Sequence, residues 1–330
     1  QVIDATGWDD DQLREAVIQA DRQVFDLAVG PPLRARLFRR EENDQVLLIT
    51  VHHIVFDGWS GSLLMHELSE AYTAIARGDT PTLPPLRASY RDFVRAQADS
   101  LASERGERHW AYWQQALAGL PLLALATDRP RPPVQTHNGA IHFFDFDAIL
   151  IRQLKGLALA AETTLFTLLL TAFQVLLHRH TGQRDIVVGS PFAARDNPKF
   201  AGVIGDFVNM LPLRLRFAGD PTFTALLEQV KTRVKEAIEH KDYPFQLLVQ
   251  GLDQKRVPGC TPLFQAVFVL QRPQIGELPW STLDSAVDEL TWGGMRATPF
   301  VIPTAEGRFD LQLEIVELPN TLVCWWNYNR

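Results

Sequence analysis

Two adjacent histidines, an aspartate and a glycine form the stretch with the clearest capacity for chemistry: His52, His53, Asp57 and Gly58 stand in the run HHIVFDGWS. They follow the mostly apolar run Gln45 to His52, which is typical of a buried strand. Catalytic groups are usually mounted on loops at strand ends. A histidine held there can accept a proton from a nucleophile and return it to a leaving group, because imidazole titrates near neutral pH. The glycine lets a ligand approach the backbone closely.

Other chemistries are open to the same residues, and most of them fail. Either histidine can simply be a polar group satisfied at the strand end. Adjacent histidines on an extended strand point to opposite faces and cannot chelate one ion together, so no metal site is predicted. The run GWSGS lacks the second glycine of a nucleophile elbow, because Ser62 stands there. No P-loop or dinucleotide fingerprint is present, and no tightly bound cofactor is predicted.

The elements around this stretch can be read from periodicity. Leu33 to Arg40 alternates apolar residues with arginine and predicts a half-buried strand, and Ser60 is expected to cap a helix that follows the site. Phe309 to Ile315 also alternates, which predicts that Gln312 and Glu314 face water. The remaining strands are expected at Ile141 to Phe146, Asp185 to Gly189 and Leu263 to Gln271, and the helices at Tyr90 to Ala98, Glu104 to Leu117, Ala148 to Ala161, Leu165 to His180 and Thr222 to His240. This mixture predicts an α/β layered sandwich, with the three strands Asp185 to Gly189, Leu263 to Gln271 and Phe309 to Leu318 in one sheet.

Length and composition limit the class of protein. The 330 residues suit two domains, and the proline-rich stretch at 127–136 marks their expected boundary, giving lobes 1–130 and 131–330. A long surface loop within one domain is the alternative. The net charge of −7 disfavours nucleic acid as a partner, and two distant cysteines favour a reducing cytoplasm over a disulfide framework. No apolar run is long enough to predict a membrane span.

The run HHIVFDG resembles the H-H-x-x-x-D-G motif of condensation domains of nonribosomal peptide synthetases. Further stretches resemble that family in the same order: YRDF at 90–93 with WAYWQQAL at 110–117, SPFAAR at 190–195, IGDFVNMLPLR at 204–214, HKDYPF at 240–245 and PLFQ at 262–265. The family's R-H-[ED]-x-L-R segment is absent, so an N-terminal strand and helix are expected to be missing from this piece. The two histidines exclude the heterocyclisation branch, which carries aspartates instead.

The resemblance implies two lobes of chloramphenicol-acetyltransferase type arranged in a V, with the site in a tunnel between them. A donor acyl or peptidyl thioester arrives on the 4′-phosphopantetheine arm of one carrier protein, and an acceptor amine arrives on another. Attack of the amine on the thioester gives an amide and a free thiol. The expected partners are the donor and acceptor carrier domains and an adjacent adenylation domain.

The resemblance also assigns roles within the motif. His53 positions or deprotonates the amine, whereas His52 is structural. Asp57 holds the loop through an ion pair with Arg195, and the N–H group of Gly58 lines the channel and stabilises the oxyanion.

Three further residues are candidates for lining the tunnel, namely Trp59, Ser60 and Asn209. Packing is the alternative for Trp59, and capping a strand is the alternative for Asn209. Two rival functions stay open. One is a free-standing acyltransferase of the same fold that uses coenzyme A or a hydroxyl acceptor. The other is a non-catalytic scaffold that docks carriers, although such domains typically lose the second histidine, which is present here as His53.

Overall fold

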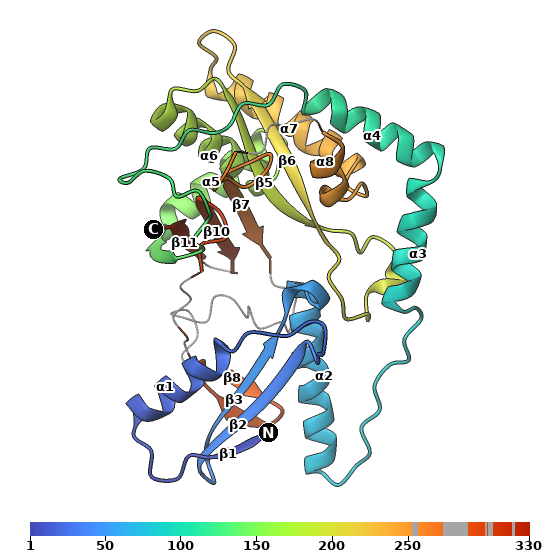
Figure 1. The fold of residues 1–330 in the computed structure, drawn as a ribbon, viewed down its shortest axis with the longest axis vertical. Helices are drawn as coiled ribbons and strands as arrows, with labels where there is room; N and C mark the ends of the chain where they lie inside the picture. Colours follow the sequence, from blue (N-terminus) through green and yellow to red (C-terminus); the bar gives the residue numbers. More distant parts are fainter. Residues whose placement is uncertain (253–256, 273–289, 301, 303–305, 319–320) are drawn as a thin grey trace. The chain divides into compact units, whose positions relative to one another are not determined.

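The chain separates into two compact units, each of which mixes helices and strands (Figure 1). The computed structural model describes residues 1–252, 257–272, 290–300, 302, 306–318 and 321–330. The first unit comprises Gln1–Tyr90, Lys199–Phe207 and Gly276–Pro303, and the second comprises Arg91–Pro198, Val208–Ile275 and Thr304–Arg330. The predicted α/β class is confirmed.

A three-stranded sheet forms the centre of the first unit, with its strands in the order β1-β2-β3. β1 pairs parallel with β2, which turns back as an antiparallel hairpin into β3. The helix α1 packs its apolar stripe of Leu13, Val17 and Ala20 with Phe38 and Leu48 of the hairpin. The elements are β1 (Val2–Asp4), α1 (Asp10–Asp21), β2 (Leu33–Glu41), β3 (Asp44–Val51), a 3-10 turn (His53–Val55), α2 (Gly58–Ala76), β8 (Leu290–Trp292) and β9 (Met295–Ala297).

A six-stranded mixed sheet forms the centre of the second unit, in the order β4-β11-β10-β7-β5-β6. Its strands are β4 (Gly139–Asp145), β5 (Asp185–Ala193), β6 (Val208–Arg216), β7 (Ala266–Gln271), β10 (Leu311–Glu317) and β11 (Leu322–Asn329). The prediction that β5, β7 and β10 share one sheet is confirmed, because β7 pairs parallel with both of the others.

Helices cover this sheet and close the main hydrophobic core. Leu170 and Phe173 of α6, Val230 of α7 and Trp113 of α4 are buried against strand residues such as Phe268. Threonine side chains cap two of these helices, Thr164 before α6 and Thr222 before α7, as their N-cap preference favours. The helices are α3 (Tyr90–Leu101), α4 (Glu104–Ala116), α5 (Ala148–Ala160), α6 (Leu165–Thr181), α7 (Phe223–Glu239) and α8 (Phe245–Gly251).

The two units do not divide at the expected boundary near residue 130. Residues 91–130 belong to the second unit, and 199–207 return to the first. The physical reason lies in packing, since Trp113, Leu117 and Leu123 are buried in the core of the second unit. The proline-rich stretch is therefore a connector that follows these residues, and the lobes 1–130 and 131–330 stay a prediction.

The prediction that Glu314 faces water is wrong. Its side chain is buried, and Gln271 and Gln312 donate hydrogen bonds to its carboxylate at 2.6 and 2.8 Å. The polar face of β10 is covered because Val316 lies on it within an apolar cluster that includes Trp325 of the neighbouring strand. Burial raises the pKa of Glu314 to about 7.

No single helix within the described residues is long and apolar enough to cross a membrane. The consecutive helices α5 and α6 reach that length and composition only as a pair, and they are bent by 105° at the break between them. Much of α6 is buried in the core of the second unit.

Candidate functional site

His52 holds the turn that follows β3. Its Nδ1 accepts a hydrogen bond from the N–H of Ile54 at 3.1 Å, so it caps the short 3-10 turn that begins at His53. Its own N–H donates to the carbonyl of Pro32 at 2.8 Å, and its ring meets the ring of Phe25 edge-on at 5.9 Å between centroids. These contacts support the structural role expected of the first histidine.

His53 is presented by that turn with 53% of its side chain exposed. Its Nδ1 lies 3.8 Å from Oδ2 of Asp206, a residue of the segment that returns to the first unit. The imidazole is thus open to reactants on one side and faces a carboxylate on another. Sequence reasoning did not select Asp206. The available signal was an acidic residue at the variable position of the I-G-x-F-V-N stretch.

Asp57 is the N-cap of α2, which corrects the expectation that Ser60 caps this helix. Its Oδ1 accepts from the N–H of Ser60 at 2.8 Å, the pattern that makes aspartate a favoured N-cap. Its Oδ2 accepts from the N–H of Phe207 at 3.0 Å. With 2% of its surface exposed, Asp57 joins the start of α2 to the returning segment. Arg195 belongs to the second unit, so its pairing with Asp57 stays a prediction.

Ser60 and Tyr90 fix the same segment from two further directions. The hydroxyl of the buried Ser60 donates to the carbonyl of Gly205 at 2.8 Å and accepts from its N–H at 3.0 Å. The hydroxyl of Tyr90 donates to the carbonyl of Asp206 at 2.7 Å. A Cβ atom on Gly205 would lie 2.2 Å from the ring of Tyr90, so only glycine fits there. These bonds support a structural role for Ser60.

Gly58 and Trp59 occupy the first turn of α2 with different surroundings. Gly58 is exposed, and nothing lies within 4 Å of the place a Cβ would take. The first N–H groups of a helix have no acceptor within the helix and carry partial positive charge. Trp59 is half-buried and donates from Nε1 to the carbonyl of Ala201 at 2.9 Å, which supports its packing alternative.

Asn209 lies in the second unit and holds a turn between α7 and α8. Its Nδ2 donates to the carbonyls of Lys241 and Tyr243, both at 2.7 Å, and its Oδ1 accepts from the N–H of Phe245 at 2.8 Å. These three bonds support a structural role. Lining of a tunnel by Asn209 stays a prediction.

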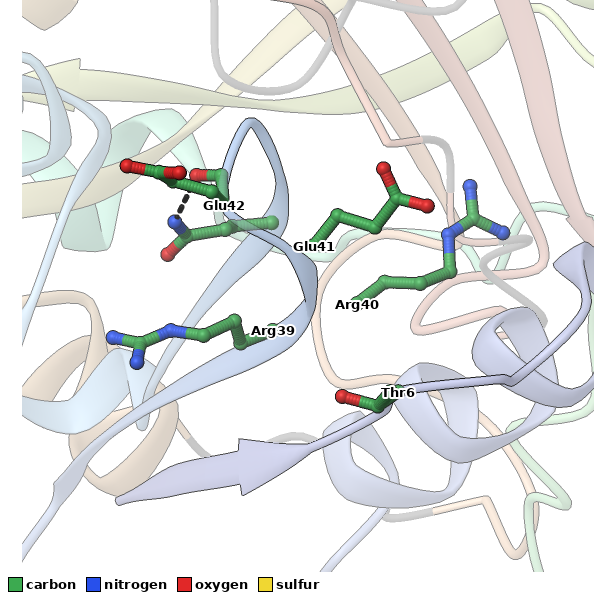
Figure 2. A pocket seen from close by; sticks show the side chains of 6 residues that line it. Thr6, Arg39, Arg40, Glu41 and Glu42 are labelled. Carbon is green, nitrogen blue, oxygen red and sulfur yellow. Dashed lines mark hydrogen bonds between the residues drawn. The ribbon is translucent and has the colours of Figure 1, made fainter.

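A polar hollow lies at the far end of the β2–β3 hairpin (Figure 2). Arg40 in its lining pairs with Asp10 and Asp44, so the hollow holds paired charges. His53 follows the opposite end of β3, and the hollow contains none of the candidate residues. The lining residues are Thr6, Arg39, Arg40, Glu41, Glu42 and Gln45. Across the described ranges, no three His, Cys, Asp or Glu side chains gather into a metal-binding group.

Comparison with known proteins gives a consistent result. The family model of the condensation domain matches residues 1–330. A linear gramicidin synthase of Brevibacillus parabrevis is 40% identical over 97% of this chain, which spans 4% of that protein. Isonitrile lipopeptide synthase of Mycobacterium tuberculosis is 37% identical over 96% of this chain, which spans 12% of it. The chain therefore corresponds to a small part of these relatives.

Solved structures agree in fold. The X-domain from teicoplanin biosynthesis matches with a TM-score of 0.85 at 24% identity, covering 100% of this chain and 73% of that one. A four-domain nonribosomal peptide synthetase bound to AMP and glycine matches with a TM-score of 0.84 at 26% identity, covering 99% of this chain and 25% of that one. With the H-H-x-x-x-D-G residues on one braced turn and the family model matched from end to end, this chain belongs to the condensation domain family of nonribosomal peptide synthetases.

Proposed function

We propose that this chain forms an amide bond between a donor acyl or peptidyl thioester on one carrier domain and an acceptor amine on another. The observation that carries the proposal is the exposed imidazole of His53 on a turn fixed from both sides. His52 caps that turn, and the buried Asp57 ties the helix behind it to residue 207. Such a turn holds an acid–base group in one place, which general acid–base catalysis requires.

The reaction proposed for this site balances with one proton carrier. The acceptor nitrogen attacks the thioester carbonyl and forms the C–N bond, while Nε2 of His53 takes a proton from that nitrogen. The carbonyl oxygen becomes an oxyanion, for which the N–H of Gly58 at the start of α2 is the proposed donor. The C–S bond then breaks, and the sulfur receives the proton held by His53 and leaves as a thiol.

Tethering of both reactants supplies part of the rate. Holding two reactants in one geometry replaces a bimolecular step by an effectively unimolecular one. The proposed carriers of the reactants are 4′-phosphopantetheine arms, which the protein handles as substrates. Donor and acceptor carrier domains and an adenylation domain are the proposed partners, since the family's relatives are multidomain synthetases.

Single-turnover transfer between two loaded carrier domains tests this function. The donor carrier holds an acyl thioester, the acceptor carrier holds an aminoacyl thioester, and intact-protein mass spectrometry detects the amide on the acceptor. We expect the product to depend on this chain and on both carriers. Transfer from acyl-coenzyme A to a free acceptor, with none between carriers, would favour the acyltransferase rival. Binding of carriers without any transfer would favour the scaffold.

A further inference from the structure

The segment that carries Asp206 is fixed on both sides of that residue. Gly205 is bound through its N–H and its carbonyl to the hydroxyl of Ser60, and the N–H of Phe207 donates to the buried carboxylate of Asp57. The carbonyl of Asp206 itself accepts from the hydroxyl of Tyr90. The backbone of Asp206 therefore has one position relative to the turn that presents His53, and both belong to the first unit.

The Asp206 carboxylate faces one particular ring nitrogen of His53. The distance from Nδ1 to Oδ2 is 3.8 Å, within reach of an ion pair and longer than a hydrogen bond. Catalytic hydrogen bonds are often long in the absence of reactants and shorten when the complex forms. A carboxylate beside one nitrogen of an imidazole keeps the proton on that nitrogen and leaves the other as the base.

Other charged groups near His53 in the described part of the first unit are engaged elsewhere. His52 turns its Nδ1 to the N–H of Ile54, and Asp57 accepts from Ser60 and Phe207. On the hairpin side, the guanidinium of Arg34 lies 4.0 Å from the ring centroid of Phe25. Among these groups, Asp206 is the one within ion-pair distance of the His53 ring.

We propose that Asp206 is a positioning residue for the acid–base cycle of His53, a role that rests on the proposed amide-forming function. Asp206 stays ionised throughout and forms no bond with the substrate. It keeps the Nδ1 proton of His53 in place, so that Nε2 takes the proton of the acceptor amine. It also stabilises the imidazolium that exists between attack of the amine and departure of the thiol. Asp206 occupies the variable position of its motif, so this assignment adds to the site a residue that the H-H-x-x-x-D-G pattern does not contain.

The test compares four proteins: wild type, Asp206→Asn, Asp206→Glu and the control Asp79→Asn. Asp79 is exposed beyond the far end of α2, so its substitution removes the same charge away from His53. The first measurement is the titration midpoint of the His53 ring by nuclear magnetic resonance of 15N-labelled histidine, with the signal assigned from its loss in His53→Ala. The second is the pH profile of single-turnover amide formation. Thermal melting checks that each variant is folded.

The expected shift follows from the distance and the exposure. Two unit charges at 3.8 Å in a medium as polar as water change a titration midpoint by about one pH unit. In Asp206→Asn we expect the His53 midpoint and the acid limb of the rate profile to move down together by roughly that amount. The rate at its plateau should fall about 10- to 100-fold, since a weaker and less well oriented base remains. Asp206→Glu should recover part of both effects, and Asp79→Asn should show neither.

Two failures can be told apart. If the wild type forms amide while the His53 midpoint stays unchanged in a folded Asp206→Asn variant, the role of Asp206 is overturned and the proposed function stands. If the midpoint moves as expected but the wild type forms no amide between loaded carriers, the proposed function is overturned, and with it the role of Asp206 in a proton cycle.

Discussion

Replacing Asp57 by alanine removes a buried carboxylate that has two backbone partners. The loss of an N-cap costs about 0.5 to 2 kcal/mol, which applies to the bond from Ser60 to Oδ1. The N–H of Phe207 is left without this acceptor in a nearly fully buried residue, and such a loss costs about 1 to 3 kcal/mol. The two effects together predict that Asp57→Ala lowers the free energy of unfolding by roughly 2 to 5 kcal/mol.

Thermal melting provides the assay for this substitution. In a domain of 150 to 250 residues, each kcal/mol moves the melting temperature by about 2 to 4 °C, so the expected decrease is roughly 4 to 20 °C. Asp147→Ala is the matched control, because Asp147 is also an aspartate N-cap but is exposed at the start of α5. It should lose only the cost of a cap.

The outcome separates structure from chemistry at Asp57. A variant that melts like the wild type while its amide formation collapses would refute the structural role and make Asp57 a direct participant. A double-mutant cycle with Arg195→Ala tests the predicted ion pair, and a coupling energy near zero would exclude it.

Three other substitutions have expected outcomes. His52→Ala should lower the melting temperature and slow amide formation less than His53→Ala does, because His52 caps the turn through Ile54; an unchanged melting temperature would contradict this. Burial lowers the pKa of both His109 and His240 below 6.5, so the unfolded chain binds protons more readily and stability should decrease as pH falls below about 6.5; urea midpoints from pH 7.5 to 5 check this, and His109→Gln should flatten the trend. Burial raises the pKa of Glu314 to about 7, so stability should decrease as pH rises from 4.5 to 7; Glu314→Gln should be more stable than wild type at pH 8 by up to about 3 kcal/mol, and equal midpoints there would contradict the burial effect.

Local patterns in the sequence predicted local structure well. Apolar runs and helical spacing placed β3, α2, α6 and α7 within one or two residues of their observed bounds. The pairing of His52 and His53 at the end of a strand was also correct. These features depend on residues close together in the chain, so periodicity and turn chemistry determine them.

Contacts between distant segments account for what the sequence did not predict. Asp206 lies 153 positions after His53 and meets it only because Asp57, Ser60 and Tyr90 hold the returning segment in place. Glu314 follows an alternating pattern that predicts exposure, yet a neighbouring strand and apolar cluster bury it. Ser60 was a plausible cap by type, but Asp57 precedes it in the right geometry and takes that place.

The proton-transfer role of His53 is the central claim, and the single-turnover rate of His53→Ala tests it most directly. The rate constant for amide formation between loaded carrier domains is compared with that of the wild type and of His66→Ala, an exposed histidine on α2. We predict a decrease of about 10²- to 10⁴-fold in His53→Ala, the range of a lost acid–base group, with carrier affinity unchanged and a residual rate from tethering. We expect no change in His66→Ala. A folded His53→Ala protein that forms amide at the wild-type rate would contradict the account.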